Sequence, residues 1–330
     1  NRSKKALQAF VAKFDQHGSL EQNFGNRHGL YIFDKANAYS ITIEDSVIQN
    51  DHSLVVAGWQ IGKEQKVSTF LRKIYTEGIE VPDFPQNEST IYGKYYAITR
   101  AFNGTDLLLT GESNDDILVT KYTENGSLVK DFGKKGTLLL DIKGRDEGRS
   151  IAAQTNSSIL VGGVTDFKIV NRAKTGEGVV IGINGNGTIS NHFGVEGVEF
   201  IENSSSDFAQ VTAIRIENAG NFYALGSEGT KDKRQSIFIR FYSPFGHLNK
   251  SFGKAGKISF PGTSGAHSSL LNNDTLLFGG QSPDGRMLNY KFVKDDNKIT
   301  PHIPVIPVGL SFQARIPEAI QKLFINEAGN

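Results

Sequence analysis

The chain has no cysteine and only one methionine and one tryptophan among its 330 residues. The lack of cysteine excludes disulfide bonds, a thiol nucleophile and thiolate metal sites. The formal net charge of +1 gives no general field that would attract nucleic acid, so we expect no nucleic-acid partner. No apolar run reaches the roughly 18 residues of a membrane span. Glycine, with 36 residues, and phenylalanine, with 22, are abundant, which favours strands joined by tight turns.

A turn phrase recurs along the chain. It consists of a glycine, a polar residue, an aliphatic residue, three further residues and then Phe-Gly. Four clear copies occupy residues 18–25, 126–133, 187–194 and 246–253. Two weaker copies keep the spacing, with Gly78 and Phe84 in one and Asn297 and Ile303 in the other. Six copies of a unit of about 50 to 60 residues therefore fill the chain.

Between the turn phrases lies an apolar run that ends in glycine. Its five copies end at Gly58, Gly111, Gly162, Gly226 and Gly279. Each run follows another strand and a polar hairpin turn, so one unit comprises four antiparallel strands. Because such a meander exposes two apolar faces, the copies must stack, and radial stacking closes the array. The predicted fold class is therefore all-β: a single six-bladed β-propeller domain over residues 1–330.

The two ends of the chain resemble parts of one blade. Residues 325–330 resemble 216–221, the end of an inner strand, and residues 2–14 resemble 231–241, a loop and a third strand. We expect the closing blade to take its third and fourth strands from about residues 6–36. Its inner strand would come from about residues 313–328, and its second strand would be missing.

Together, the turn phrase and the apolar run resemble the bacterial delta-60 repeat, a β-propeller repeat of secreted and surface proteins. The resemblance covers nearly the whole chain. The residues that carry it, such as Gly126, Leu128 and Phe132, are turn and core residues. The resemblance therefore implies a propeller and a secreted, periplasmic or cell-surface location, and it implies no activity.

The sequence contains no recognisable catalytic or metal-binding motif. Its seven histidines include no His-x-x-x-His pair, and there is no Gly-x-Ser-x-Gly elbow or phosphate loop. We therefore expect no metal and no cofactor. Paired acids for a glycosidase would have to come from different blades, because adjacent residues on a strand point to opposite faces.

Two predicted loops between second and third strands are long and basic. Such loops lie on the face of a propeller where partners usually bind, and their cations suit an anionic glycan or protein segment. The predicted ligand-binding residues are Lys168, Arg172 and Lys174 in segment 164–177, and Lys231, Lys233 and Arg234 in segment 228–236. The alternative is that both segments are solvated loops without a ligand.

A second set of polar residues lies where inner strands begin, at the mouth of the central funnel. The set comprises Arg149, Asp207 and His267. These residues could contact a ligand, although polar residues would also line a water-filled channel.

Three functions remain open. The first is a secreted or cell-surface recognition module, expected to be a monomer, that binds a protein or glycan through the loop face. The second is a carbohydrate-active enzyme, a hydrolase or lyase, with acids from several blades converging on the funnel. The third is a scaffold domain of a longer chain. The lack of a catalytic motif and the basic loops favour the first. A funnel with no carboxylate cluster, metal or deep polar pocket would exclude the second.

Overall fold

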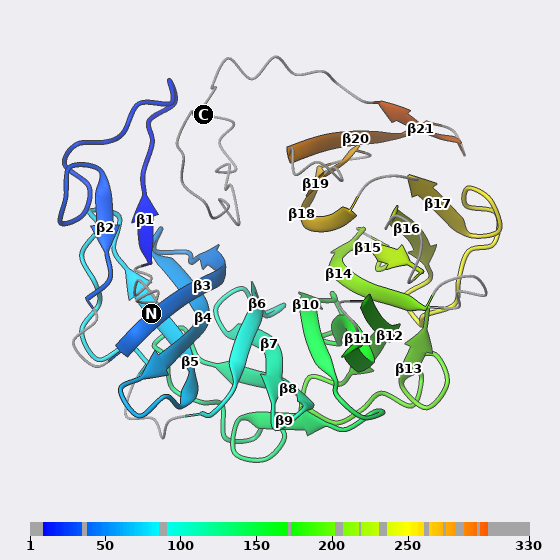
Figure 1. Cartoon of the computed structure of the whole chain (residues 1–330), viewed down its shortest axis with the longest axis horizontal. Helices are drawn as coiled ribbons and strands as arrows, with labels where there is room; N and C mark the ends of the chain where they lie inside the picture. The colour runs from blue at the N-terminus through cyan, green and yellow to red at the C-terminus, as the bar shows by residue number, and fades with distance from the viewer. Residues whose placement is uncertain are drawn as a thin grey trace. The chain divides into compact units, whose positions relative to one another are not determined.

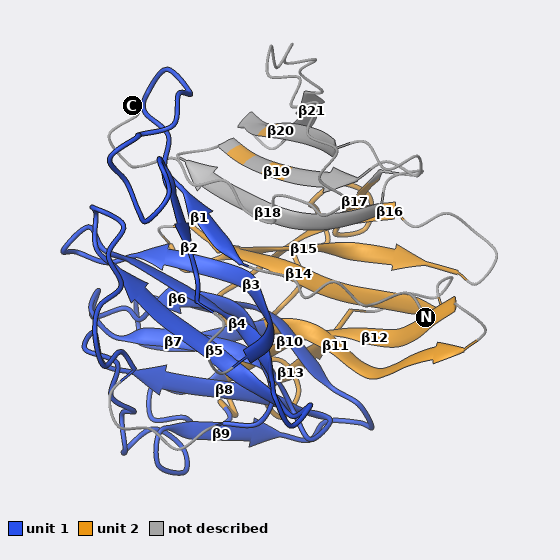
Figure 2. Cartoon of the chain, turned by 60° about the vertical axis from the view of Figure 1, so that its left-hand side comes forward, with its two compact units in different colours: residues 1–161, 183–189, 325–330 blue, residues 162–182, 190–324 orange. Residues whose placement is uncertain are grey.

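The computed structural model describes residues 9–34, 38–85, 91–170, 173–201, 207–217, 219–230, 236–260, 264–272, 275–281, 287–295 and 298–302. Over these residues the chain is all-β and contains no helix, as predicted. It divides into two compact units, shown in different colours in Figure 2. Unit 1 comprises residues 1–161, 183–189 and 325–330, and unit 2 comprises residues 162–182 and 190–324.

Unit 1 is built from antiparallel sheets that follow one another along the chain. Its strands are β1 (Phe10–Ala12), β2 (Leu30–Ile32), β3 (Ala38–Ile48), β4 (Leu54–Gly62), β5 (Val67–Ile74), β6 (Lys94–Arg100), β7 (Leu107–Ser113), β8 (Asp116–Tyr122), β9 (Thr137–Leu140), β10 (Glu147–Ala153) and the start of β11 (Ile159–Val170). β1 pairs with β2, β3 to β5 form one sheet, and β6 to β9 form another (Figure 1). Apolar side chains of the last two sheets, among them Val55, Leu71, Leu107 and Leu118, pack together in one core.

Unit 2 repeats this organisation. Its strands are the rest of β11, β12 (Ala173–Ile183), β13 (Val198–Phe200), β14 (Phe208–Ile216), β15 (Phe222–Gly229), β16 (Ser236–Tyr242), β17 (Lys257–Phe260), β18 (Ser264–Asn272), β19 (Thr275–Gln281), β20 (Met287–Asp295) and β21 (Lys298–His302). β14 to β17 pair in chain order, and so do β18 to β21. Leu225 and Ile239 of the first group pack with Phe278 and Phe292 of the second.

The turn phrases connect consecutive copies of the repeat. The backbone N–H of Gly25 donates to Glu77 O at 2.9 Å, that of Gly133 to Asn186 O at 2.8 Å and that of Gly194 to Phe245 O at 2.9 Å. In each case a Phe-Gly glycine reaches the turn of the next copy. The turn glycines have positive φ and lie against the preceding phrase: a Cβ on Gly126 (φ 86°) would be 2.7 Å from the ring of Phe84. The residues that define the repeat therefore join neighbouring copies.

The inner strands share an irregularity. β3, β6 and β14 each contain a one-residue β-bulge opposite the glycine that ends the apolar run of the second strand. The extra residues are Glu44, Tyr96 and Thr212. In β18 the register shifts at Gly265 and at His267. Because a bulged residue leaves the ladder, its side chain can be aimed independently of the pleat.

Most of the predicted strands are confirmed, and one predicted loop is wrong. The second-strand run that ends at Gly111 lies in β7, and two strands in residues 6–36, β1 and β2, pair with each other. The segment 313–328 lies outside the described residues. Segment 164–177, predicted as a loop, is mostly strand, because β11 continues to Val170 and β12 begins at Ala173. The β-branched residues Val164, Thr165, Ile169 and Val170 favour this extension.

Candidate functional site

Polar side chains gather in unit 1 where the inner strands begin. Two of them, Glu44 and Tyr96, are the bulged residues of β3 and β6. When β10 is aligned with β6, Arg149 takes the position of Tyr96. The second strands contribute Trp59 and Glu112, each directly after the strand glycine. The positions at which the repeats differ therefore lie together at one end of the sheets.

Glu44 is a partly buried acid with an aromatic partner. Its Oε1 accepts a hydrogen bond from the indole Nε1–H of Trp59 at 2.9 Å. Burial raises the pKa of the Glu44 carboxyl above its usual value, against the opposing effects of the Trp59 hydrogen bond and of the charges of Arg149 and Lys94. Glu44 therefore holds a proton to higher pH than an ordinary glutamic acid.

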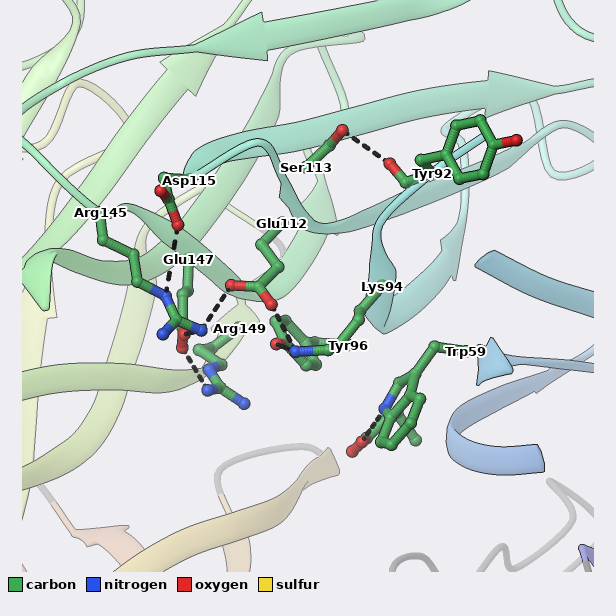
Figure 3. A network of polar contacts seen from close by, with 11 residues as sticks. Trp59, Tyr92, Lys94, Tyr96, Glu112, Ser113, Asp115, Arg145, Glu147 and Arg149 are labelled. Atoms are coloured by element: carbon green, nitrogen blue, oxygen red, sulfur yellow. Dashed lines mark hydrogen bonds and ion pairs between the residues drawn. The ribbon is translucent and has the colours of Figure 1, made fainter. Parts of the chain in front are cut away.

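Five charged side chains form an alternating chain beside it (Figure 3). Lys94 Nζ lies 2.5 Å from Glu112 Oε1, and Arg145 Nη2 lies 2.9 Å from Glu112 Oε2. The same Arg145 nitrogen lies 2.8 Å from Glu147 Oε1, and Glu147 Oε2 accepts from Arg149. The Glu147 side chain is only 1% exposed, so its charge depends on these two arginines. Figure 3 also shows Asp115 at the edge of the chain, on Arg145.

The two acids at this site are shifted in opposite directions. Burial would raise the pKa of Glu112, but hydrogen bonds from Lys94 and Arg145 outweigh it and lower this pKa to about 2. Glu112 is therefore ionised under all ordinary conditions, whereas the pKa of Glu44 is raised and its carboxyl keeps a proton to higher pH than an ordinary glutamic acid. Lys94 connects them, because its Nζ binds Glu112 and lies 5.7 Å from the centre of the Trp59 ring.

Tyr96 lies in the middle of this group. The guanidinium of Arg149 stacks 4.0 Å from the centre of its ring, and Lys94 Nζ lies 3.5 Å from its hydroxyl oxygen. Burial raises the pKa of the Tyr96 phenol, so the hydroxyl stays neutral and can donate or accept hydrogen bonds. The site thus offers a proton donor, a fixed carboxylate and two aromatic rings that are only partly buried.

The predicted residues of the funnel mouth have different surroundings. Arg149 belongs to the charged chain just described. Asp207 is exposed in unit 2, where its carbonyl accepts from Gly176 N–H at 3.2 Å. His267 lies in β18 at a bulge, as its predicted place at the start of an inner strand requires.

The predicted loop-face residues lie only partly within the described residues. Lys168 is exposed and pairs with Asp166 at 2.7 Å, and Lys174 lies 5.7 Å from the centre of the Phe208 ring. Arg172, Lys231, Lys233 and Arg234 lie outside the described residues. Anionic-ligand binding by these residues stays a prediction.

Sequence reasoning missed most of the charged chain. Glu44, Glu112 and Glu147 belong to no motif, and they lie more than 30 residues apart in the sequence. A signal was nevertheless present in the aligned repeats. The residue after the second-strand glycine is Trp59, Glu112 or Ser227, in contrast to the constant glycine before it.

Two searches of the described part of the chain gave negative results. No group of three or more His, Asp or Glu side chains there could hold a metal ion. No helix of membrane-spanning length and hydropathy occurs there either.

Comparisons with known proteins add distant structural similarities. No known family matches the sequence, and no curated protein does. A neuraminidase-like protein of subtype N11 from A/flat-faced bat/Peru/033/2010 is 9% identical, with 90% of this chain and 80% of that chain covered and a TM-score of 0.47. A protein of unknown function from Dyadobacter fermentans gives 8% identity, coverage of 89% and 85% and a TM-score of 0.46. An alpha-L-arabinofuranosidase from Clostridium thermocellum gives 8% identity, coverage of 81% and 96% and a TM-score of 0.41. At these scores the similarities decide neither detailed fold nor function.

Proposed function

We propose that the protein is a carbohydrate-active enzyme and that the cluster in unit 1 is its active site. The observation that carries the proposal is a pair of acids beside two partly exposed aromatic rings, Glu44 and Glu112, whose surroundings shift their pKa values in opposite directions. Cleavage of a glycosidic bond needs one protonated and one ionised carboxyl, and sites achieve this by giving the two acids different surroundings. This was the second of the three functions that the sequence left open.

In this proposal Glu44 donates a proton to the glycosidic oxygen of the leaving group. The Trp59 indole orients the Glu44 carboxyl, and Glu112 supplies the carboxylate that general-base or nucleophilic assistance requires. Lys94 and Arg145 hold Glu112 in place and keep it ionised. Trp59 and Tyr96 provide ring faces on which a sugar can stack.

The test is hydrolysis of a panel of 4-nitrophenyl glycosides and plant and bacterial polysaccharides by the wild-type chain and by Glu44→Gln. Loss of a general acid reduces kcat by about 100-fold or more on substrates with poor leaving groups. Glu64→Gln is the matched control, because Glu64 is 79% exposed on a turn of the same unit. Activity of Glu44→Gln equal to that of the control, or a wild-type chain inactive on the whole panel, would overturn the proposal.

A second candidate is recognition of an anionic glycan or protein at the loop face. The observation in its favour is the end of the β11–β12 hairpin, where Lys168, Ile169 and Val170 are at least half exposed. Lys168→Glu combined with Lys174→Glu should weaken binding to an acidic glycan on an array by about tenfold. Lys66→Glu, at an equally exposed cation in unit 1, should leave it unchanged.

We propose further that the repeats close into one six-bladed propeller and that the protein is exported. Closure is supported by the hydrogen bonds between turn phrases, which link three pairs of consecutive copies. Export is supported by the resemblance to the delta-60 repeat alone. An experimental structure in which the C-terminal segment pairs in the same blade as β1 would establish the closure, and termini on separate blades would contradict it.

A further inference from the structure

Unit 1 offers a second candidate site at the other end of the sheets. The acids described above lie where inner strands begin, whereas the hairpins between inner and second strands lie at the opposite ends. β6 spans Lys94 to Arg100, so the two ends are about 20 Å apart. A ligand at the hairpin end would therefore not touch Glu44 or Glu112.

Three hairpins of the repeat can be aligned by a shared hydrogen bond. The first residue after the inner strand donates across the turn: Gln49 N to Ser53 O at 2.9 Å, Ala101 N to Asp106 O at 2.7 Å and Gln154 N to Ser158 O at 2.7 Å. In the three hairpins the donor residue is preceded by Ile48, Arg100 and Ala153 respectively. It is followed by Asn50, Phe102 and Thr155. Equivalent positions at successive junctions can thus be compared.

The junction between the first and second hairpins is filled by a polar pair. Arg100 Nη1 donates to Asn50 Oδ1 at 2.6 Å, and Asn50 Nδ2 donates to Gly104 O at 3.2 Å. Gln49 Nε2 adds a hydrogen bond to Glu124 O at 3.3 Å. These contacts occupy the space between the two hairpins.

The next junction has different residues at the same positions. Phe102 replaces the asparagine and Ala153 replaces the arginine. A cavity of about 280 Å³ lies there, with Phe102, Leu108, Ala153 and Ile159 among its walls. Leu108 and Ile159 are buried, whereas Phe102 is 54% exposed. Exchange of a polar pair for a ring and a methyl group therefore leaves an apolar space with an uncovered aromatic wall.

The charges around this cavity cancel. Lys121, which also lines it, pairs with Asp106 at 3.3 Å, and both side chains are less than one-fifth exposed. The remaining polar groups of the lining are Asn103 and Ser157. A charged ligand would gain no counter-ion here, whereas an uncharged ring with one hydroxyl or N–H group would match the lining.

We propose that this cavity binds a small uncharged aromatic molecule. Its volume exceeds the roughly 150 Å³ that suffices for benzene in an apolar protein cavity, so one substituted ring fits. The ring would pack on Phe102 and Leu108, and its polar substituent would face Asn103 and Ser157. For a ligand of about ten heavy atoms we expect a Kd of about 1 mM.

The test uses phenol and indole as probes, titrated into the isotopically labelled full chain and followed by NMR shifts of the 101–103 and 153–159 amides. The wild-type chain should give saturable shifts. Ala153→Arg with Phe102→Asn rebuilds the filled junction and should weaken binding at least tenfold. Arg100→Ala with Asn50→Phe is the reciprocal exchange and should create a second binding site.

Ala153→Leu gives an independent check if the double variants fold poorly, because it fills the cavity without introducing a charge. Unsaturable shifts in the wild-type chain, or equal affinity in the wild-type and filled variants, would overturn the proposal. Glycoside cleavage at the other end of the sheets should not change in Ala153→Leu. The two proposals therefore fail independently.

Discussion

The strand group β6–β9 in unit 1 and the strand group β14–β17 in unit 2 have the same construction and different chemistry. Both are four-stranded meanders with one bulge in the inner strand and a glycine opposite it. In the first, the bulged Tyr96 contacts Lys94 and Arg149. In the second, the bulged residue is Thr212, whose buried hydroxyl has no hydrogen-bond partner among the described residues. The scaffold is repeated, and the chemistry of each strand group depends on the few positions at which the repeats differ.

The comparison extends to the buried acids. Unit 2 has its own, Glu228, which binds Lys257 Nζ at 2.9 Å and lies within 3.5 Å of a serine hydroxyl. Glu228 pairs with Lys257, whereas Glu147 of unit 1 pairs with both Arg145 and Arg149. Arg145 also binds Glu112, so two acids of unit 1 share one arginine. We regard the pair of Glu228 and Lys257 as structural, and the linked acids and cations of unit 1 as a site.

The largest expected effect tests whether the shared glycine belongs to the scaffold. A Cβ on Gly111 would overlap the carbonyl oxygen of Lys94, and one on Gly226 would overlap that of Gln210. Gly111→Ala and Gly226→Ala should each lower the free energy of unfolding by about 3 kcal/mol, measured in urea. Gly62→Ala is the control, because its nearest neighbour would be 3.8 Å away. If Gly111→Ala were as mild as the control, the bulge could shift freely.

The next effect separates the two buried acids. Glu147→Gln leaves Arg145 and Arg149 without their shared carboxylate, whereas Glu228→Gln removes the carboxylate that Lys257 binds. We expect losses of about 2.5 kcal/mol and about 1.5 kcal/mol respectively in the same urea experiment. Equal losses would mean that the second arginine adds nothing to the unit 1 chain.

These comparisons also show how far the sequence could predict the molecule. Gly126 identified the turn phrase because its positive φ requires glycine, and Phe132 did so because a buried ring packs against the turn of the next copy. Glu112 and Glu147 could not be joined from the sequence, since their common partner Arg145 lies in a loop outside the repeat pattern. Arg149 was selected as a funnel residue from its place before an inner strand, but its partners were not. Turns can be predicted from their local sequence. Contacts between side chains of different repeats depend in addition on strand register and on the positions of the bulges.

The smallest effect concerns the two acids of the proposed active site, which should give stability profiles of opposite sign with pH. The folded-state pKa of Glu112 is lowered, so its contribution to stability is present above the unfolded pKa near 4.5 and is lost as the pH falls toward about 2. The folded-state pKa of Glu44 is raised, so the folded state binds more protons, and stability decreases as the pH rises from near 4.5 through the raised folded-state pKa. Glu112→Gln should therefore reduce the loss of stability between pH 4.5 and pH 2, measured by urea unfolding at both pH values.

Glu44→Gln should behave differently, because an amide still accepts the Trp59 hydrogen bond and no longer has to ionise in a partly buried place. We expect it to raise the free energy of unfolding at pH 7 by up to about 1 kcal/mol while it abolishes glycoside cleavage. Thermal unfolding at pH 5 and pH 8 measures the first effect, and the gain should be larger at pH 8. A destabilised Glu44→Gln at both pH values would mean that Glu44 is part of the scaffold, as Glu228 is, and the contrast between the two units would then be one of degree.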